Sequence, residues 1–455
     1  RQEMTAGLPG NVPGSPSPSP RRIVLYPGRL CNRPSKAFLT TNTPNDILDM
    51  SGAGEEHRGD FSTRRDEWWV KEACMRFGRV ILENWRNFTH VDVALQERAF
   101  LVGPNASGKS NFLDVFRFLR DVAQPVGGFE RAVTNPTRGG VSRIRALAAR
   151  RYSDVAIEVG LHDSRNVAWR YRLAFNQDNR RRPVIREEKV WHGADLVLER
   201  PDNSDREDPE RLRQTHLEQV FVNQPFREIA DFFASVRYYH IVPQLVRDPN
   251  RSVGIRGDPY GGDFLEQIAR TDQRTRSARL RRILVALKVA VPQLSALQLE
   301  EDERGVPHLR GRYEHWRPQG AWQTEADFSD GTLRLMGLLW ALLEGSGPLL
   351  LEEPELSLHP GVVPYLPQVM LRVQRDRPAR QILLSTHSAD LLQDEGVAPD
   401  EILPFMPEEE GATVQSGATI EEVHRLLDAG LSPAEVVIPH TRPANVAQLA
   451  FWGEE

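Results

Sequence analysis

The segment Gly103–Ser110 reads GPNASGKS and matches the phosphate-binding pattern G-x-x-x-x-G-K-S/T. The glycines let the backbone direct N–H groups at phosphate oxygens, and a helix that starts at the loop would add its positive end. We expect Lys109 to contact the β- and γ-phosphates of a nucleotide, and Ser110 to bind Mg²⁺ through its hydroxyl. The residues predicted to contact the nucleotide here are Gly103, Pro104, Asn105, Ala106, Ser107, Gly108, Lys109 and Ser110.

The alternative is a Gly-rich turn that arose by chance. The context argues against it, because an apolar stretch at 99–102 leads into the segment and apolar residues at helical spacing follow it. Arginine dominates the 58 Lys and Arg residues, yet one of the five lysines of the chain stands at position 109. We therefore interpret this segment as a nucleotide-binding loop.

A second group of polar residues follows an apolar stretch in Pro348–Pro360, PLLLEEPELSLHP. A buried strand would present Glu352 and Glu353 at its carboxyl end, which is where ligands bind in open α/β sheets. We expect Glu352 to hold the Mg²⁺ shell through water and Glu353 to polarise the attacking water as a general base. An ordinary acidic helix start is the alternative, and the phosphate-binding loop upstream favours the catalytic interpretation.

Two further segments could face a phosphate. Gln381–Leu392, QILLSTHSADLL, reads as a buried strand ending in Ser-Thr-His, where His387 could contact the γ-phosphate or be an ordinary loop histidine. In Phe328–Leu335, FSDGTLRL, the start of a helix would form a second anion site. An ordinary capped helix fits this second segment equally well. Its candidate residues are Ser329, Asp330 and Gly331.

These segments need a mixed α/β scaffold to bring them together. Short strands are expected at 80–82, 91–95, 99–102, 155–161, 167–175, 189–198, 348–351 and 381–385, with a hairpin over 297–313. Helices are expected at 110–122, 264–291 (one helix or a pair), 332–343 and 362–375. The charged segment 200–215 is expected to be a surface loop.

Composition limits the class of protein. The 455 residues are 40% hydrophobic and 27% charged, which favours a packed core over global disorder. The sequence holds no apolar run long enough for a membrane-spanning helix, and two cysteines indicate a reducing, cytoplasmic setting. The net charge of −5 still allows a local basic groove. Residues 1–74 include the Pro/Ser tract 11–20 and are expected to be a disordered extension, or sequence upstream of a true start at Met75.

The order GPNASGKS, FSDGT, LLLEEPELSLHP and STHS resembles the ABC-type ATPase head of the RecF, SMC and OLD class. More closely, it is similar to bacterial AAA-family ATPases found in phage-defence and toxin–antitoxin-like loci. The segment NWRNF at 84–88 also resembles the opening of that family. The resemblance covers residues 75 to about 438 and implies an α/β fold, a P-loop NTPase with an ABC-type head of two lobes. The expected parts are a mixed sheet, an antiparallel β region and a helical insertion around 200–295, all within one domain at 75–455.

The resemblance also implies ATP and Mg²⁺ as cofactors, with Glu353 as the catalytic glutamate and His387 as the switch histidine. Residues 329–331 correspond to the signature motif, which in the family contacts the γ-phosphate held by the other protomer, so an ATP-dependent homodimer is implied. Glu352 departs from the aspartate commoner in the family, and its extra methylene is expected to shift the metal contact rather than abolish it. The candidates for the glutamine loop of the family are Gln124, Gln224 and Gln244.

The function implied is ATP hydrolysis with dimerisation that gates a DNA-linked process, DNA repair or phage defence, through a separate effector protein and without a membrane. The alternatives are a nucleotide-gated scaffold with little turnover and a transporter ATPase subunit. Transporter subunits carry an LSGGQ-type signature, which the sequence SDGT at 329–332 does not match. Three arginine clusters fit either DNA binding or a solvated face. They are Arg131, Arg138, Arg143, Arg145, Arg150 and Arg151; Arg180, Arg181, Arg182 and Arg186; and Arg270, Arg274, Arg276, Arg279, Arg281 and Arg282.

Overall fold

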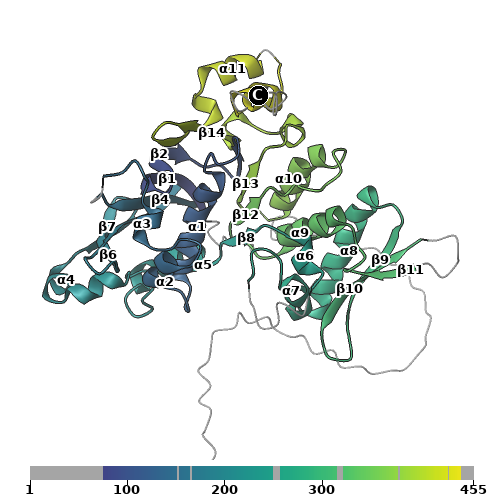
Figure 1. Cartoon of the computed structure of the whole chain (residues 1–455), viewed down its shortest axis with the longest axis horizontal. Helices are drawn as coiled ribbons and strands as arrows, with labels where there is room; N and C mark the ends of the chain where they lie inside the picture. Colours follow the sequence, from purple (N-terminus) through teal and green to yellow (C-terminus); the bar gives the residue numbers. More distant parts are fainter. Residues whose placement is uncertain are drawn as a thin grey trace, which may run out of the picture. The chain divides into compact units, whose positions relative to one another are not determined.

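The computed structural model describes residues 75–150, 153–163, 166–248, 257–314, 321–377, 380–428 and 430–441. All of them belong to one of the two compact units of the chain, Val70–Glu455 (Figure 1). The expectations for residues 1–74 and for Arg151 lie outside the described residues. In the described part of the chain, no helix is both long enough and apolar enough to cross a bilayer.

One sheet is antiparallel, with the strand order β2–β1–β4–β5–β6–β7. Its strands are β1 (Arg76–Trp85), β2 (Phe88–Ala94), β4 (Val155–Asp163), β5 (Asn166–Gln177), β6 (Pro183–His192) and β7 (Asp195–Arg200). Val80 and Leu82 of β1 are buried while Arg79 is exposed, the alternation expected of a sheet with one face on a core. The strands expected near 80, 91, 155 and 167 are therefore present.

The single strand expected over 189–198 is wrong. The chain reverses at Gly193, whose φ of +58° is a left-handed conformation that glycine adopts without steric cost. β6 and β7 consequently form a hairpin in which His192 pairs with Asp195. The periodicity of the segment did not reveal this turn, because apolar residues stand on both sides of it.

The segment 200–215 lies largely at the surface, as expected, but it is not an irregular loop. The segment contains α4 (Asn203–Glu207) and a 3₁₀ helix (Pro209–Arg213). Arg200 is buried there and forms ion pairs with Glu188 (2.9 Å) and Asp205 (2.7 Å), whose side chains are fully enclosed. Buried charges of this kind persist only when they are paired, so Arg200 and Asp205 belong to a core network. Most of the other charged residues of the segment are exposed, namely Arg206, Glu207, Asp208, Glu210 and Arg211.

The second sheet carries the phosphate-binding segment and has the strand order β15–β14–β3–β13–β12–β8. Its strands are β3 (Arg98–Val102), β8 (Arg237–Tyr239), β12 (Leu349–Glu352), β13 (Ile382–Thr386), β14 (Ile402–Glu408) and β15 (Gly411–Val414). All pairings within it are parallel except that of β15 with β14. Every residue of β3 and β13 is buried, as in parallel sheets covered on both faces. Figure 1 shows β13, β12 and β8 in succession at the centre of the unit.

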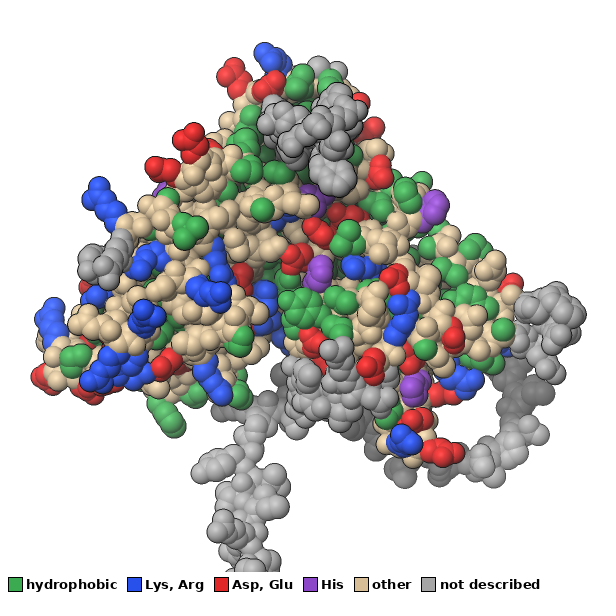
Figure 2. Space-filling model, viewed as in Figure 1, with side chains coloured by type: hydrophobic (Ala, Val, Ile, Leu, Met, Phe, Trp, Pro, Cys, Tyr) green, Lys and Arg blue, Asp and Glu red, His purple; other side chains and the backbone are tan. Residues whose placement is uncertain are grey.

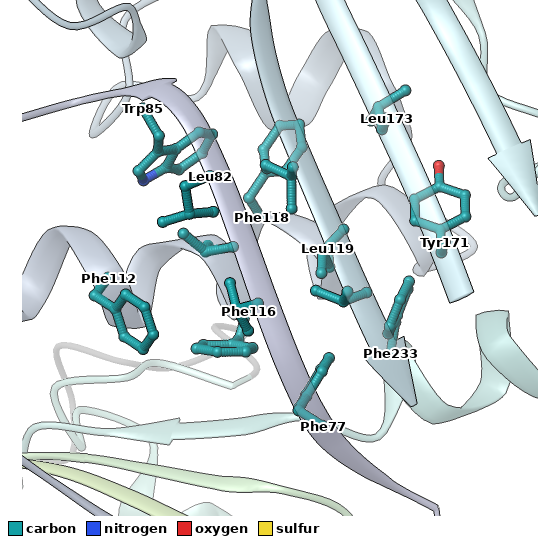
Figure 3. Packing of buried hydrophobic residues seen from close by; sticks show 14 of the residues in the cluster. Phe77, Leu82, Trp85, Phe112, Phe116, Phe118, Leu119, Tyr171, Leu173 and Phe233 are labelled. Carbon is teal, nitrogen blue, oxygen red and sulfur yellow. The ribbon is translucent and has the colours of Figure 1, made fainter. Parts of the chain in front are cut away.

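Helix α1 (Lys109–Ala123) packs between the two sheets. Figure 3 shows Phe116 of α1 beside Phe77 of β1, with ring centroids 4.6 Å apart. On the other side, Phe112 lies 5.6 Å from Phe405 of β14. One helix thus joins the cores of both sheets through aromatic contacts, and each buried ring contributes about 1.5–3 kcal/mol of hydrophobic stabilisation. The helix that leaves the phosphate-binding segment is therefore held at its position by the main core.

A second core lies around α9 (Asp330–Leu343), where Trp340 is fully buried. A three-stranded sheet, β11–β10–β9, belongs to it. The other elements there are α6 (Pro243–Val246), α7 (Phe264–Arg270), α8 (Gln273–Ala290), β9 (Leu294–Glu301), β10 (Pro307–Tyr313), β11 (Ala321–Thr324) and α10 (Leu366–Asp376). The helix expected over 264–291 is a pair, interrupted at Thr271 and Asp272, and β11 adds a strand that periodicity did not reveal.

The remaining helices are short. They are α2 (Phe129–Thr134), α3 (Val141–Ile144), α5 (Arg227–Ala234), α11 (Glu421–Asp428) and α12 (Pro433–Thr441), with 3₁₀ helices at Gln224–Phe226, Val363–Tyr365, Asp390–Gln393, Pro399–Glu401 and Gly417–Thr419. Within the insertion expected around 200–295, α5 lies in the first core and α7 and α8 lie in the second. The domain boundaries stay a prediction.

Candidate nucleotide site

The loop Gly103–Ser110 connects β3 to α1 and encloses the ammonium group of Lys109. Its Nζ donates hydrogen bonds to the carbonyl oxygens of Gly103 (2.9 Å) and Pro104 (3.0 Å). Gly108 has a φ of +102°, so the turn into the helix needs a residue that tolerates this conformation. Burial lowers the pKa of Lys109 to about 8, while nearby carboxylates oppose that shift. The loop therefore places a cation where its sequence pattern predicts a phosphate.

Asn87, in the turn between β1 and β2, supports this loop from outside. Its Nδ2 donates to the carbonyl oxygen of Ser107 (3.0 Å), and its Oδ1 accepts from Asn111 of α1 (2.8 Å). A Cβ atom at Gly108 would lie only 2.3 Å from Asn87 Nδ2, so the close approach also requires glycine there. Sequence reasoning did not single out Asn87, although it lies within the NWRNF segment that resembled the family opening.

Ser110 and Glu352, the two residues predicted to bind the metal, are in direct contact. The Ser110 hydroxyl donates to Glu352 Oε1. Both are hard oxygen donors of the kind that Mg²⁺ prefers. Among the described residues, no cluster of three or more His, Cys, Asp and Glu side chains could hold a metal by itself. Two protein oxygens at the end of a phosphate-binding loop fit Mg²⁺, because Mg²⁺ at such sites takes its remaining ligands from phosphates and water.

Glu353 and His387, the two residues predicted to be catalytic, also lie together. Glu353 Oε1 is 2.9 Å from His387 Nε2. The backbone of Glu353 has a φ of +43°, an unusual conformation for a residue with a side chain, and its N–H donates to the carbonyl oxygen of Ser385 (3.1 Å). Burial and the nearby charge of Lys109 lower the pKa of His387, and Glu353 opposes them. A neutral His387 can therefore donate a hydrogen bond from Nε2 to Glu353 Oε1.

Glu355 is a residue that sequence reasoning missed. Its Oε1 accepts hydrogen bonds from Thr386 Oγ1 (2.6 Å) and from the backbone N–H of His387 (3.3 Å). Burial raises its pKa. Glu355 thereby joins the segment after β12 to the end of β13 and positions His387. The sequence did contain a hint of this role, because Glu355 is the third glutamate of the segment EEPE at 352–355.

Ser329, Asp330 and Gly331 form a separate place at the start of α9. Ser329 Oγ accepts from the N–H of Thr332 (3.2 Å) and caps the helix. With Ser357, Leu358 and His359, the three residues line a pocket of about 370 Å³ to which the loop 103–110 does not contribute. A Cβ atom at Gly331 would lie 2.5 Å from the carbonyl oxygen of Ser357. The structure thus brings the other predicted site residues together but keeps these three apart.

The candidate glutamines do not contact Glu352. Gln244 Nε2 donates to Asp330 Oδ2 (3.4 Å), and Gln124 caps the end of α1 while Gln224 lies in a 3₁₀ helix. Two residues at β8 contact Glu352 instead. The hydroxyl of Tyr238 donates to Glu352 Oε2, and His240 Nδ1 lies 3.3 Å from the Glu352 carbonyl oxygen. The position of a glutamine loop stays unassigned.

A pocket of about 1010 Å³ opens beside the loop. Asn87 and Asn111 line it, together with arginines from the turns around α3 and with acidic residues 408–410. No residue of the loop 103–110 lines this pocket, which adjoins the loop through Asn87 and Asn111.

Residues 98–393 match the sequence model of the family described as "AAA domain, putative AbiEii toxin, Type IV TA system". These are 296 of the 455 residues. The chain belongs to this AAA domain family. The family membership and the sheet order together confirm the expected α/β P-loop fold. Among curated proteins, none matches the chain.

Solved structures similar to this AAA domain protein include SMC heads. The SMC head domain from Thermotoga maritima is 12% identical, with a TM-score of 0.41, and the match covers 75% of this chain and 98% of that one. The Smc head domain with an extended coiled coil, bound to the C-terminal domain of ScpA and derived from Pyrococcus furiosus, is 12% identical, with a TM-score of 0.47 and coverage of 78% and 99%. Asn87 and residues 408–410, which flank the nucleotide loop, lie outside the AAA domain match.

Proposed function

We propose that the chain binds ATP with Mg²⁺ and hydrolyses it. The supporting observation is the meeting of three strand ends. β3, β13 and β12 are neighbouring parallel strands of one sheet. Lys109 and Ser110 follow the carboxyl end of β3, His387 follows that of β13, and Glu352 and Glu353 stand at that of β12. A phosphate-binding loop, a metal-binding pair and a base–histidine pair in one place are the parts that phosphoryl transfer to water needs.

The chemistry is positioning and charge neutralisation. Backbone N–H groups of the loop and the Lys109 ammonium would hold the phosphates, and Ser110 and Glu352 would hold Mg²⁺, which when bound neutralises charge that develops on the phosphate oxygens. Glu353 would accept a proton from the attacking water. His387 would donate to Glu353 or to the γ-phosphate and so fix the position of that water.

We propose further that the active site is completed by a second copy of the chain. Within one chain the Ser329–Gly331 segment has its own pocket, away from the loop at 103–110. Its helix α9 spans 14 residues, so its positive end would attract a γ-phosphate presented by another copy. ATP would then draw two copies together, and dimerisation would gate a separate effector in DNA repair or phage defence.

The arginines between 270 and 282, which are the candidates for DNA contacts on α7 and α8, are largely engaged within the chain. Five of the six arginines from 270 to 282 make contacts within the chain: Arg270 pairs with Glu266, Arg276 donates to the Ala269 carbonyl, Arg279 lies over Trp340, Arg281 donates to the Ser277 carbonyl and Arg282 pairs with Asp376. On the face shown in Figure 2, basic and acidic side chains of the described residues are interspersed. Contacts of this kind reduce the free positive charge available to a polyanion.

Steady-state phosphate release tests the proposal. Wild-type protein should release phosphate from ATP when Mg²⁺ is present, and EDTA should stop this release. The Glu353→Gln variant should be inactive. Tight ATP binding without phosphate release, with or without DNA, would favour the nucleotide-gated scaffold. A transporter ATPase subunit is a weaker alternative, because SDGT stands at 329–332 where that class has an LSGGQ-type signature.

A further inference from the structure

Tyr238 lies at the metal-binding end of the sheet although no sequence pattern marks it. It is on β8, the edge strand beside β12, where it pairs in register with Leu350 (Figure 1). Its side chain crosses to the end of β12, and its hydroxyl donates a hydrogen bond to Glu352 Oε2. The guanidinium of Arg117, on α1, lies 4.2 Å from the centre of its ring. Three elements therefore fix this phenol.

The two oxygens of Glu352 accept one hydroxyl hydrogen each. Ser110 donates to Oε1 and Tyr238 donates to Oε2. Because the hydroxyl of Ser110 gives its single hydrogen to Glu352, its lone pairs are available to a cation.

A glutamate needs such a restraint more than an aspartate does. It has one more rotatable bond, and every freely rotating side chain that must be ordered costs free energy when a ligand binds. Hydrogen bonds at both oxygens hold the carboxylate of Glu352 in one orientation before a metal arrives. The contact with Tyr238 thus offsets the extra freedom that comes with glutamate at this position.

We propose that Tyr238 is a positioning residue for the divalent cation, acting through Glu352. This inference rests on the proposed function, because the cation is bound together with ATP. Through Tyr238, strand β8 contributes a phenol hydroxyl that holds the metal-binding carboxylate, and Arg117 supports the ring of that phenol.

The test is the Tyr238→Phe variant, which keeps the ring under Arg117 and removes only the hydroxyl. Binding of a fluorescent ATP analogue is titrated with Mg²⁺, and separately measured in EDTA. A hydrogen bond to a charged group contributes enough to expect a rise of about tenfold in the Mg²⁺ concentration at half-saturation. Nucleotide binding in EDTA should stay within about twofold of wild type, since the loop contacts are unchanged.

Tyr239→Phe is the matched control. Tyr239 is the next residue on β8, equally buried, and its hydroxyl also donates to a glutamate, Glu344. Loss of the Tyr239 hydroxyl should lower the melting temperature and leave the Mg²⁺ concentration at half-saturation unchanged. In a Glu352→Ala background, Tyr238→Phe should have no further effect on the titration, because the phenol acts through that carboxylate. Arg117→Gln, at a half-buried position, should shift the titration in the same direction and serves as the second variant if Tyr238→Phe does not fold.

Equal titration curves for wild type, Tyr238→Phe and Arg117→Gln, with wild type dependent on Mg²⁺, would overturn the positioning role and leave the proposed function standing. A shift that persists at full size in the Glu352→Ala background would also overturn it. Absence of Mg²⁺-dependent nucleotide binding in the wild type would instead refute the proposed function, and with it this inference.

Discussion

A pair of inactive variants tests whether the active site is shared between two copies. Glu353→Gln removes the general base but leaves an amide oxygen where Glu353 Oε1 now lies 2.9 Å from His387 Nε2. Loss of a general base lowers turnover by roughly 10²–10⁴-fold. The variant should still bind ATP, and because hydrolysis would no longer separate the two copies, it should accumulate as an ATP-bound dimer.

Ser329→Arg attacks the other half of the proposed site. It places bulk and positive charge at the start of α9, where Gly331 is already packed against Ser357. The variant should bind ATP and fail to dimerise. It also removes the cap on the N–H of Thr332 (3.2 Å), which costs about 1 kcal/mol of stability. Ser329→Ala is therefore the control, since it removes the same cap without filling the pocket and should still dimerise.

Mixing the two variants gives the decisive measurement. Each mixed dimer has one of its two sites intact, so a mixed dimer can turn over at up to about half the rate of a wild-type dimer. Turnover of the mixture should therefore rise well above that of either parent. The assays are size-exclusion chromatography with saturating ATP and Mg²⁺, and phosphate release by the mixture. A Glu353→Gln protein that stays monomeric, together with a mixture no more active than its parents, would show that each chain completes its own site.

Four further predictions follow from the same contacts. Lys109→Ala should abolish ATP binding measured by calorimetry, because no other cation lies inside the loop to replace its contact; unchanged affinity would contradict the phosphate-loop interpretation. Since burial lowers the pKa of Lys109 to about 8, ATP affinity should be level near pH 7 and fall as the pH rises through about 8, by up to about tenfold per unit; affinity that stays level above that pH would contradict this reasoning. A chain beginning at Met75 should keep its melting temperature and turnover, because the described cores start at Phe77; loss of folded protein would refute this. If DNA binds, neutralising Arg274, Arg279 and Arg282 should flatten the salt dependence of binding, and no affinity of the wild type at low salt would refute the DNA hypothesis.

Local patterns predicted much of this fold and site. The loop around Lys109, the acidic end of β12 and the histidine after β13 each lie in one short segment whose order along the chain is visible. Parallel strands bring their carboxyl ends to the same edge of a sheet, so the meeting of Glu353 and His387 follows once the strands are recognised. The contact of Ser110 with Glu352 follows in the same way.

The residues that sequence reasoning missed depend on long-range neighbours. Tyr238 contacts Glu352 only because β8 pairs with β12, and 114 positions of sequence separate the two residues. Nothing in the three-residue strand predicts that pairing. Asn87 reaches the loop through a turn between β1 and β2, and Arg200 becomes buried because two carboxylates from separate elements enclose it. Contacts of this kind are set by packing rather than by periodicity.

Three glutamates within four positions illustrate how environment separates roles that composition leaves equivalent. Glu352 receives two hydroxyl hydrogens, an arrangement that suits a carboxylate held rigid for a cation. Glu353 faces His387, whose Nε2 lies 2.9 Å from its Oε1. Burial raises the pKa of Glu355, and its hydrogen bond from Thr386 makes it a support for the position of His387 rather than a base. The three roles differ because β8, β13 and the segment after β13 each place a different donor beside one of three otherwise similar side chains.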